Sequence, residues 1–159
     1  KKATTIPVFA VQGNLNHNYR RCWDLLVNIL RENWRFDFKV KVIGRGKLPA
    51  ALMPYKTKII LCNNLNFLDY HREFLDIYCL ILPNTPESTP FYFGPKQTSS
   101  ISYLQSYNIH GLLHEKLFQV APTLQRVTTF SSNENFLVAF EEVLNSFYHN
   151  RERRTDIDQ

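Results

Sequence analysis

A lysine and three hydroxyl side chains stand close together in the chain and could bind phosphate. Lys96 precedes Thr98, Ser99 and Ser100, at the point where a polar loop ends and a helical pattern begins. The first turn of a helix offers free N–H groups and a partial positive charge, so a cation and hydroxyls placed there favour an anion. Helix capping alone would also explain the Ser and Thr residues.

Other candidate residues follow strand-like segments. Gly13 and Asn14 follow the apolar run from Ile6 to Val11, Arg45 follows a strand pattern that ends at Ile43, and Asn64 follows Ile59–Leu61. Ligands of open α/β sheets bind at the carboxyl ends of the strands, so these positions could contact one. A turn requirement would equally explain Gly13, and an ordinary exposed charge would explain Arg45.

The sequence singles out no catalytic or metal-binding set. The five histidines lack metal-ligand spacing, and no Ser-His-Asp or Cys-His order stands out. We therefore predict no metal and no cofactor and assign no catalytic residue. Cys22, Cys62 and Cys79 are expected to be buried, reduced thiols, which favours a reducing compartment such as the cytoplasm.

Strand and helix patterns alternate along the chain. The predicted strands are 6–11, 36–43, 59–61, 78–82, 126–130 and the start of 112–120, and the predicted helices are 18–34, 66–77, 99–107 and one that begins at 131–134. Alternation between polar and apolar residues predicts that 36–43 is half-buried. We expect a loop after the strand within 112–120, although this segment would also pass as a helix. Such alternation predicts an α/β, Rossmann-like, three-layer domain with a mainly parallel sheet of about six strands.

Length and composition fit one globular domain. The chain has 159 residues, of which 44% are hydrophobic, and we assign residues 1–150 to one domain and 151–159 to a charged tail that frays. No segment is long and apolar enough to span a membrane. Because the sequence begins at Lys1 rather than Met, we expect it to be part of a longer protein.

Charge is distributed unevenly along the chain. Residues 1–58 hold 12 Lys or Arg against 3 acidic residues, a net charge of +9, whereas residues 59–159 have a net charge of −4. This asymmetry fits an anionic ligand, although a solvated basic face would also explain it. Nucleic acid is not an expected partner, because no known nucleic-acid-binding motif is present.

The order of these landmarks resembles the C-terminal, nucleotide-sugar-binding domain of GT-B glycosyltransferases, from about Ile6 to Phe147. The matching segments are 8–13, 23–26, 42–46, 67–83, 98–109 and 132–144. The resemblance implies a nucleoside diphosphate across the carboxyl ends of the strands. Its base would lie near Arg45 and Asn63–Leu65, and its phosphates at Lys96 and Thr98–Ser100.

The sequence departs from the family at residues that matter for catalysis. Many retaining members carry a pair of glutamates around the start of the helix after the donor loop, and Pro95 and Tyr103 occupy the aligned positions. The basic pair that often neutralises the diphosphate has only Arg20 and Arg21 as candidates, and we expect both inside a helix.

Two functions therefore remain open. The first is the donor-binding half of a glycosyltransferase, which would transfer a sugar from a nucleoside diphosphate donor to an acceptor, such as a glycan, held by a second domain. The alternative is a non-catalytic, glycosyltransferase-like binding module. The departures favour the module, and the hydroxyl-rich loop with Lys96 favours the donor site.

Overall fold

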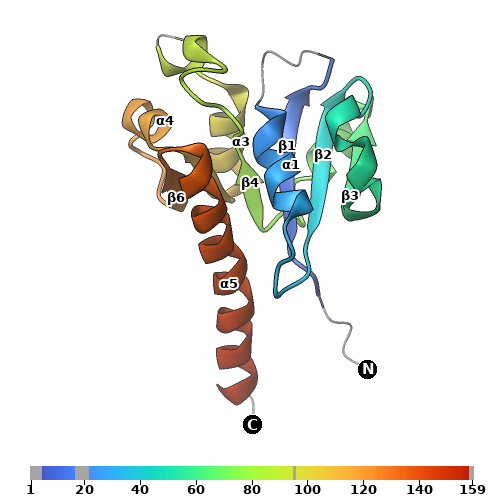
Figure 1. Ribbon diagram of the computed structural model, residues 1–159, viewed down its shortest axis with the longest axis vertical. Coiled ribbons are helices and arrows are strands. Elements are labelled where there is room, and N and C mark those ends of the chain that lie inside the picture. The colour runs from blue at the N-terminus through green and yellow to red at the C-terminus, as the bar shows by residue number, and fades with distance from the viewer. Residues whose placement is uncertain (1–4, 17–21, 95, 158–159) are drawn as a thin grey trace.

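The computed structural model describes residues 5–16, 22–94 and 96–157 (Figure 1). The strands are β1 (Val8–Asn14), β2 (Lys39–Arg45), β3 (Ile59–Asn63), β4 (Cys79–Ile81), β5 (His110–His114) and β6 (Val127–Phe130). The α-helices are α1 (Trp23–Arg31), α2 (Phe67–Arg72), α3 (Ser99–Tyr107), α4 (Glu115–Val120) and α5 (Asn133–Ile157), and two 3₁₀ segments are η2 (Ala50–Lys58) and η3 (Pro90–Phe93).

The six strands form one sheet in the order β3-β2-β1-β4-β5-β6, and every neighbouring pair is parallel. This confirms the predicted α/β, Rossmann-like fold. The first three strands are added toward one edge of the sheet and the last three toward the other, so the strand order reverses between β1 and β4. Doubly wound sheets bind ligands at this switch point. Gly13 pairs with Gly44, and Gly44 with Asn63, so the candidate residues after the first three strands meet at the carboxyl edge, as predicted.

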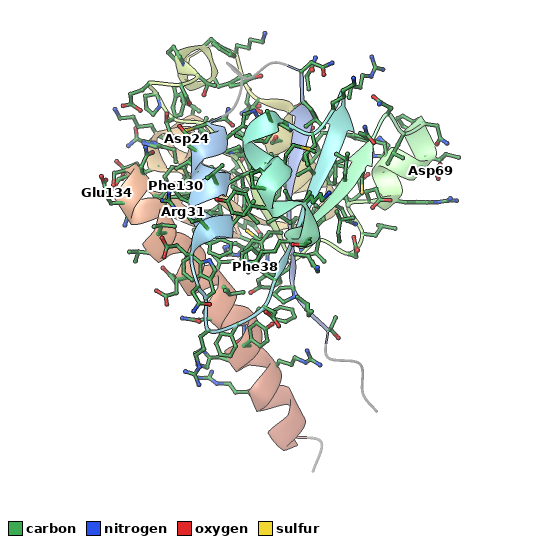
Figure 2. The ribbon with its side chains drawn as sticks, turned by 45° about the vertical axis from the view of Figure 1, so that its right-hand side comes forward. Asp24, Arg31, Phe38, Asp69, Phe130 and Glu134 are labelled. Atoms are coloured by element: carbon green, nitrogen blue, oxygen red, sulfur yellow. The ribbon has the colours of Figure 1, made fainter. Side chains whose placement is uncertain are left out.

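Each face of the sheet carries its own core. One core packs α1, η2 and α5 against Phe9, Val11, Val40 and Val42, with Phe140 4.6 Å from Phe9 between ring centroids. The other core packs α2, α3 and α4 against the opposite face through Phe74, Ile101, Leu104 and Leu117. In Figure 2, Asp69 of α2 and Glu134 of α5 lie at opposite sides of the molecule.

Several sequence predictions about individual elements were wrong, and at residues 115–120 the structure shows the helix that was left as the alternative. Lys41 was expected on the exposed side of a half-buried strand, but β2 lies inside the sheet and only 4% of Lys41 is exposed. Residues 115–120, expected as loop, form α4 after a strand that ends at His114, whose Nδ1 accepts a hydrogen bond from the N–H of Lys116. The segment from Arg151, expected to fray, continues α5 as far as Ile157.

Gly44 is required by the close approach of two strands. A Cβ atom at this position would lie 1.7 Å from the carbonyl oxygen of Gly13, far inside van der Waals contact. Residue 44 therefore has no room for a side chain where β1 and β2 end.

Candidate functional site

A pocket of about 380 Å³ opens at the carboxyl edge, above the ends of β1 and β2 and beside α2 and α3. We call it the carboxyl-edge pocket. Its lining combines the backbone of the strand ends with aromatic side chains and one cation: Gly13, Asn14, Gly44, Arg45, Leu65, Phe67, Tyr70, His71 and Tyr103.

Aromatic side chains from α2 and α3 build one wall of this pocket. Tyr70 and Tyr103 lie 6.0 Å apart between ring centroids, and Tyr103 stacks on the buried Phe74 at 4.7 Å. His71 hydrogen-bonds through Nδ1 to the hydroxyl of Tyr107. Because these rings pack on one another, the wall is held in place before any ligand enters.

Hydrogen bonds from Gln12 on β1 hold the aromatic wall in place. The Tyr70 hydroxyl donates to Oε1 of Gln12 at 2.9 Å, and Nε2 of Gln12 donates to the hydroxyl oxygens of Ser99 at 3.1 Å and Ser100 at 2.6 Å. The Gln12 side chain therefore connects β1 to both helices. It also occupies the hydroxyl of Ser100, which is buried.

The structure separates the predicted site residues into three groups. Gly13, Asn14 and Arg45 line the pocket. Asn64 lies beside them with φ of 54°, and its Oδ1 accepts the N–H of Gly46 at 3.0 Å, which shapes the turn that carries Arg45. Residues 96–100 do not line the pocket.

Among the four predicted site residues of the third group, Lys96, Thr98, Ser99 and Ser100, two are exposed. Thr98 is buried and caps α3 by accepting the N–H of Ser100, while Ser99 and Lys96 are exposed. The Lys96 ammonium lies 5.9 Å from the centre of the Phe91 ring. Pro95, Arg20 and Arg21 lie outside the described residues.

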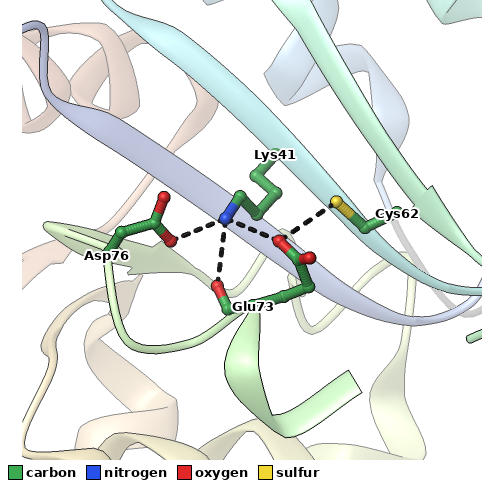
Figure 3. Close-up of polar contacts among 4 residues, drawn as sticks. All are labelled: Lys41, Cys62, Glu73 and Asp76. Carbon is green, nitrogen blue, oxygen red and sulfur yellow. Dashed lines mark hydrogen bonds and ion pairs between the residues drawn. The ribbon is translucent and has the colours of Figure 1, made fainter. Parts of the chain in front are cut away.

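An ion-pair cluster around the buried Lys41 anchors the segment that follows α2 to β2 (Figure 3). The ammonium of Lys41 lies 2.6 Å from Oδ1 of Asp76, 2.8 Å from Oε2 of Glu73 and 3.2 Å from the carbonyl oxygen of Glu73. The thiol of Cys62 donates to the same Glu73 oxygen at 3.4 Å. Burial works against a charged amine here, but the hydrogen bonds and charges of Asp76 and Glu73 outweigh it and raise the pKa of Lys41.

A second hollow, of about 490 Å³, lies above the ends of β4, β5 and β6. Its lining is polar and includes two carboxylates: Cys22, Thr85, Glu87, Ser88, His114, Ser131, Ser132, Asn133 and Glu134. Burial lowers the pKa of His114, which keeps its imidazole neutral around pH 7. The described part of the chain contains no group of three or more His, Cys, Asp or Glu that could hold a metal ion.

Sequence reasoning missed most of the pocket wall. Tyr70, Phe67, His71 and Gln12 were not considered as site residues. Tyr103 was noted only as a departure from the glycosyltransferase pattern, yet it lines the pocket. The one available signal was aromatic spacing on two helices that both start at the carboxyl edge.

Comparison with known proteins identifies the fold. No protein-family model and no curated protein sequence matches the chain. Among solved structures, the chain is similar to the apo form of the lipopolysaccharide outer core galactosyltransferase WaaB, with a TM-score of 0.65 and 12% sequence identity. The match covers 92% of this chain and 42% of that protein, so the chain spans less than half of its length.

None of the described helices is long and apolar enough to cross a membrane. Together with the strand order, the structural match shows that the chain has the fold of the C-terminal domain of a GT-B glycosyltransferase.

Proposed function

We propose that the chain is the donor-binding half of a glycosyltransferase and that the nucleoside of a nucleoside diphosphate sugar occupies the carboxyl-edge pocket. The observation that carries this proposal is the pocket itself, with Tyr70, Tyr103 and Arg45 around it at the crevice of the sheet. Aromatic faces bind bases by stacking, and a guanidinium binds phosphate or a base edge.

The diphosphate would extend from the pocket toward the start of α3. Arg45 supplies a positive charge at the pocket, and at the start of α3 the exposed Lys96 supplies a second charge and the exposed Ser99 a hydroxyl. Gly13 lets the backbone of β1 approach a ligand closely. Positive charge and helix N–H groups stabilise a departing diphosphate, which is the assistance that sugar transfer from this donor needs. The acceptor and any general base would come from a second domain.

The free cysteines fit a cytoplasmic location.

A non-catalytic binding module is the second candidate, and Tyr103 favours it. An aromatic ring occupies the pocket at a position aligned with a glutamate of many retaining members, and Thr98 and Ser100 use their hydroxyls inside the fold. A module of this kind would bind a nucleotide or another aromatic anion without turnover.

Ligand-induced stabilisation tests the donor proposal. Uridine diphosphate or guanosine diphosphate should raise the melting temperature of the chain, because a ligand that binds only the folded state stabilises it. Uridine, guanosine and inorganic pyrophosphate serve as separate arms that resolve the base and phosphate contributions. No shift with any nucleoside diphosphate at millimolar concentration would contradict the proposal.

Arg45→Ala and Lys47→Ala form a matched pair for this assay. Both side chains are exposed, but only Arg45 lines the pocket. Arg45→Ala should weaken nucleotide binding by about 1 to 3 kcal/mol, the scale of a charge-assisted hydrogen bond, and Lys47→Ala should have little effect. Equal affinities for both variants would place the nucleotide elsewhere.

A further inference from the structure

The edge strand β3 lacks the features that normally prevent edge pairing. Its sequence, Ile59-Ile60-Leu61-Cys62-Asn63, contains no charged residue and no proline. Ile60 and Leu61, which point to opposite faces of the sheet, are 39% and 40% exposed. Soluble proteins usually protect an edge strand with lysine, proline or a bulge, so an uncharged apolar edge indicates a partner.

The exposed apolar surface continues from β3 onto α2. Leu65, between β3 and α2, is 37% exposed, Phe67 and Leu68 on α2 are 75% and 65% exposed, and Leu75, which follows α2, is 75% exposed. We call Ile60, Leu61, Leu65, Phe67, Leu68 and Leu75 the β3–α2 surface, of which Leu65 and Phe67 also line the carboxyl-edge pocket. Figure 2 shows α2, marked by Asp69, at the outer side of the molecule. Several exposed apolar residues within one segment favour an interaction site, whereas Val138 is the one large exposed hydrophobic residue on the described part of α5.

The backbone of β3 is directed outward at alternate residues. The N–H of Asn64 donates to the carbonyl oxygen of Gly44 on β2 at 2.9 Å. In a parallel ladder, the two backbone groups of one residue point to the same neighbour and those of the next residue point away. The N–H and C=O groups of Leu61 and Asn63 therefore face away from β2 and can pair with another strand, whereas the N–H of Ile59 donates to the carbonyl oxygen of Lys56.

This edge is complementary to itself. In an antiparallel pair of two copies centred on Leu61, each Leu61 faces the other, Ile59 faces Asn63, and Lys58 faces Asn64, so no like charges oppose each other. Lys58 also turns back into its own chain, where its ammonium donates to the carbonyl oxygen of Leu30. On α2, Asp69 and Arg72 form an ion pair, so this part of the surface carries no net charge.

We propose that a second copy of this chain docks on the β3–α2 surface and pairs β3 with β3 in antiparallel register about Leu61. The contact is isologous, as in most symmetric dimers, and continues the sheet across the two-fold axis. The uncharged strand and the neutral α2 pair select against a strongly charged partner. An apolar strand of the same sequence satisfies both the backbone groups and the exposed side chains.

Sedimentation equilibrium of this chain tests the proposal. We expect a monomer–dimer equilibrium over roughly 1 to 200 µM, the range in which modest interfaces dissociate. Leu61→Lys should weaken the dimer by about tenfold or more, because it places like charges opposite each other on the axis. The matched control Val138→Lys changes an equally apolar, exposed residue on α5 and should leave the equilibrium unchanged.

A charge-swap mixture tests the register. Leu61→Lys and Leu61→Glu should each be mostly monomeric alone, and their equimolar mixture should dimerise again, because residue 61 faces itself only in the proposed pairing. Circular dichroism confirms that the variants are folded. A wild-type chain that stays monomeric, assembles beyond a dimer, or dimerises equally well with Leu61→Lys would overturn the proposal. A mixture that remains monomeric would overturn the register.

Discussion

The two hollows at the carboxyl edge share one sheet but offer opposite chemistry. The carboxyl-edge pocket, over β1 and β2, presents aromatic rings and Arg45. The second hollow, over β4 to β6, presents Glu87 and Glu134, and no Lys or Arg is among its described lining residues. A helix N-terminus attracts anions, but Glu134 already occupies the first turn of α5. Side chains rather than the fold therefore decide which hollow suits an anionic ligand.

Gly44→Ala should have the largest effect on stability and should disrupt the carboxyl-edge pocket. Its Cβ would collide with the Gly13 carbonyl, so β1 and β2 would have to separate, and we expect a loss of about 3 kcal/mol or more in the free energy of unfolding. Gly94→Ala is the control, because no atom lies within 4 Å of the added Cβ. Urea denaturation measures both, and equal stabilities would show that the strand ends can move apart.

Lys41→Met should produce the next largest effect. It leaves Glu73 and Asp76 without their cation and detaches the end of α2 from the sheet, at an expected cost of about 2 kcal/mol because both carboxylates keep some access to water. Lys39→Met, on the same strand but only half-buried, removes a hydrogen bond to the carbonyl oxygen of Thr57 and no ion pair, and it should cost under about 1 kcal/mol.

Two further measurements test whether the stability lost in Lys41→Met comes from the unpaired carboxylates and whether the loosening is confined to α2. Adding Glu73→Gln to Lys41→Met should recover part of the lost stability, since it removes one unpaired carboxylate. Hydrogen exchange should be faster at α2 amides and unchanged at β6. An equal increase in exchange rate across the whole sheet would contradict a local role for the Lys41–Glu73–Asp76 cluster beside the carboxyl-edge pocket.

The smallest expected effect concerns pH and the second hollow. Burial lowers the pKa of His114 below 6.5 in the folded chain, so the unfolded chain binds more protons as pH falls through 6.5. The free energy of unfolding should therefore decrease between pH 7.5 and pH 5. His114→Asn, which can keep the helix cap, should reduce this slope, and a smaller slope should remain because burial also lowers the pKa of His110. Identical slopes in both proteins would exclude His114 as a source.

Local signals were strong enough to predict the parallel sheet and its six strands, although not their exact ends, and to predict one helix to the residue. The helix predicted at 99–107 matches α3, because Thr98 caps its start and Asn108, with φ of 51°, ends it in the left-handed conformation. The α2 segment was predicted too long, since only Phe67–Arg72 is α-helical and Glu73–Asp76 form turns.

The side-chain environment was harder to predict than the backbone. Lys41 follows a polar–apolar alternation that normally indicates solvent, but its partners, Glu73 and Asp76, are distant in sequence and cover it in the fold. Likewise, Ser100 has the type expected of a phosphate ligand, and only the position of Gln12 on β1 shows that its hydroxyl points inward. Such pairings depend on tertiary contacts that spacing along the chain does not encode.

The three free cysteines differ in burial, so their reaction with a thiol reagent can report partial unfolding of the domain. Cys22 is half-exposed, whereas Cys62 and Cys79 are buried. Burial and the Glu73 carboxylate raise the pKa of Cys62 to about 11, and complete burial raises the pKa of Cys79. An alkylating reagent should therefore modify Cys22 first and Cys62 when the Glu73 segment lifts from the sheet. Modification of Cys79 should require separation of β4 from both neighbouring strands, so the order of covalent labelling records the order in which the domain opens.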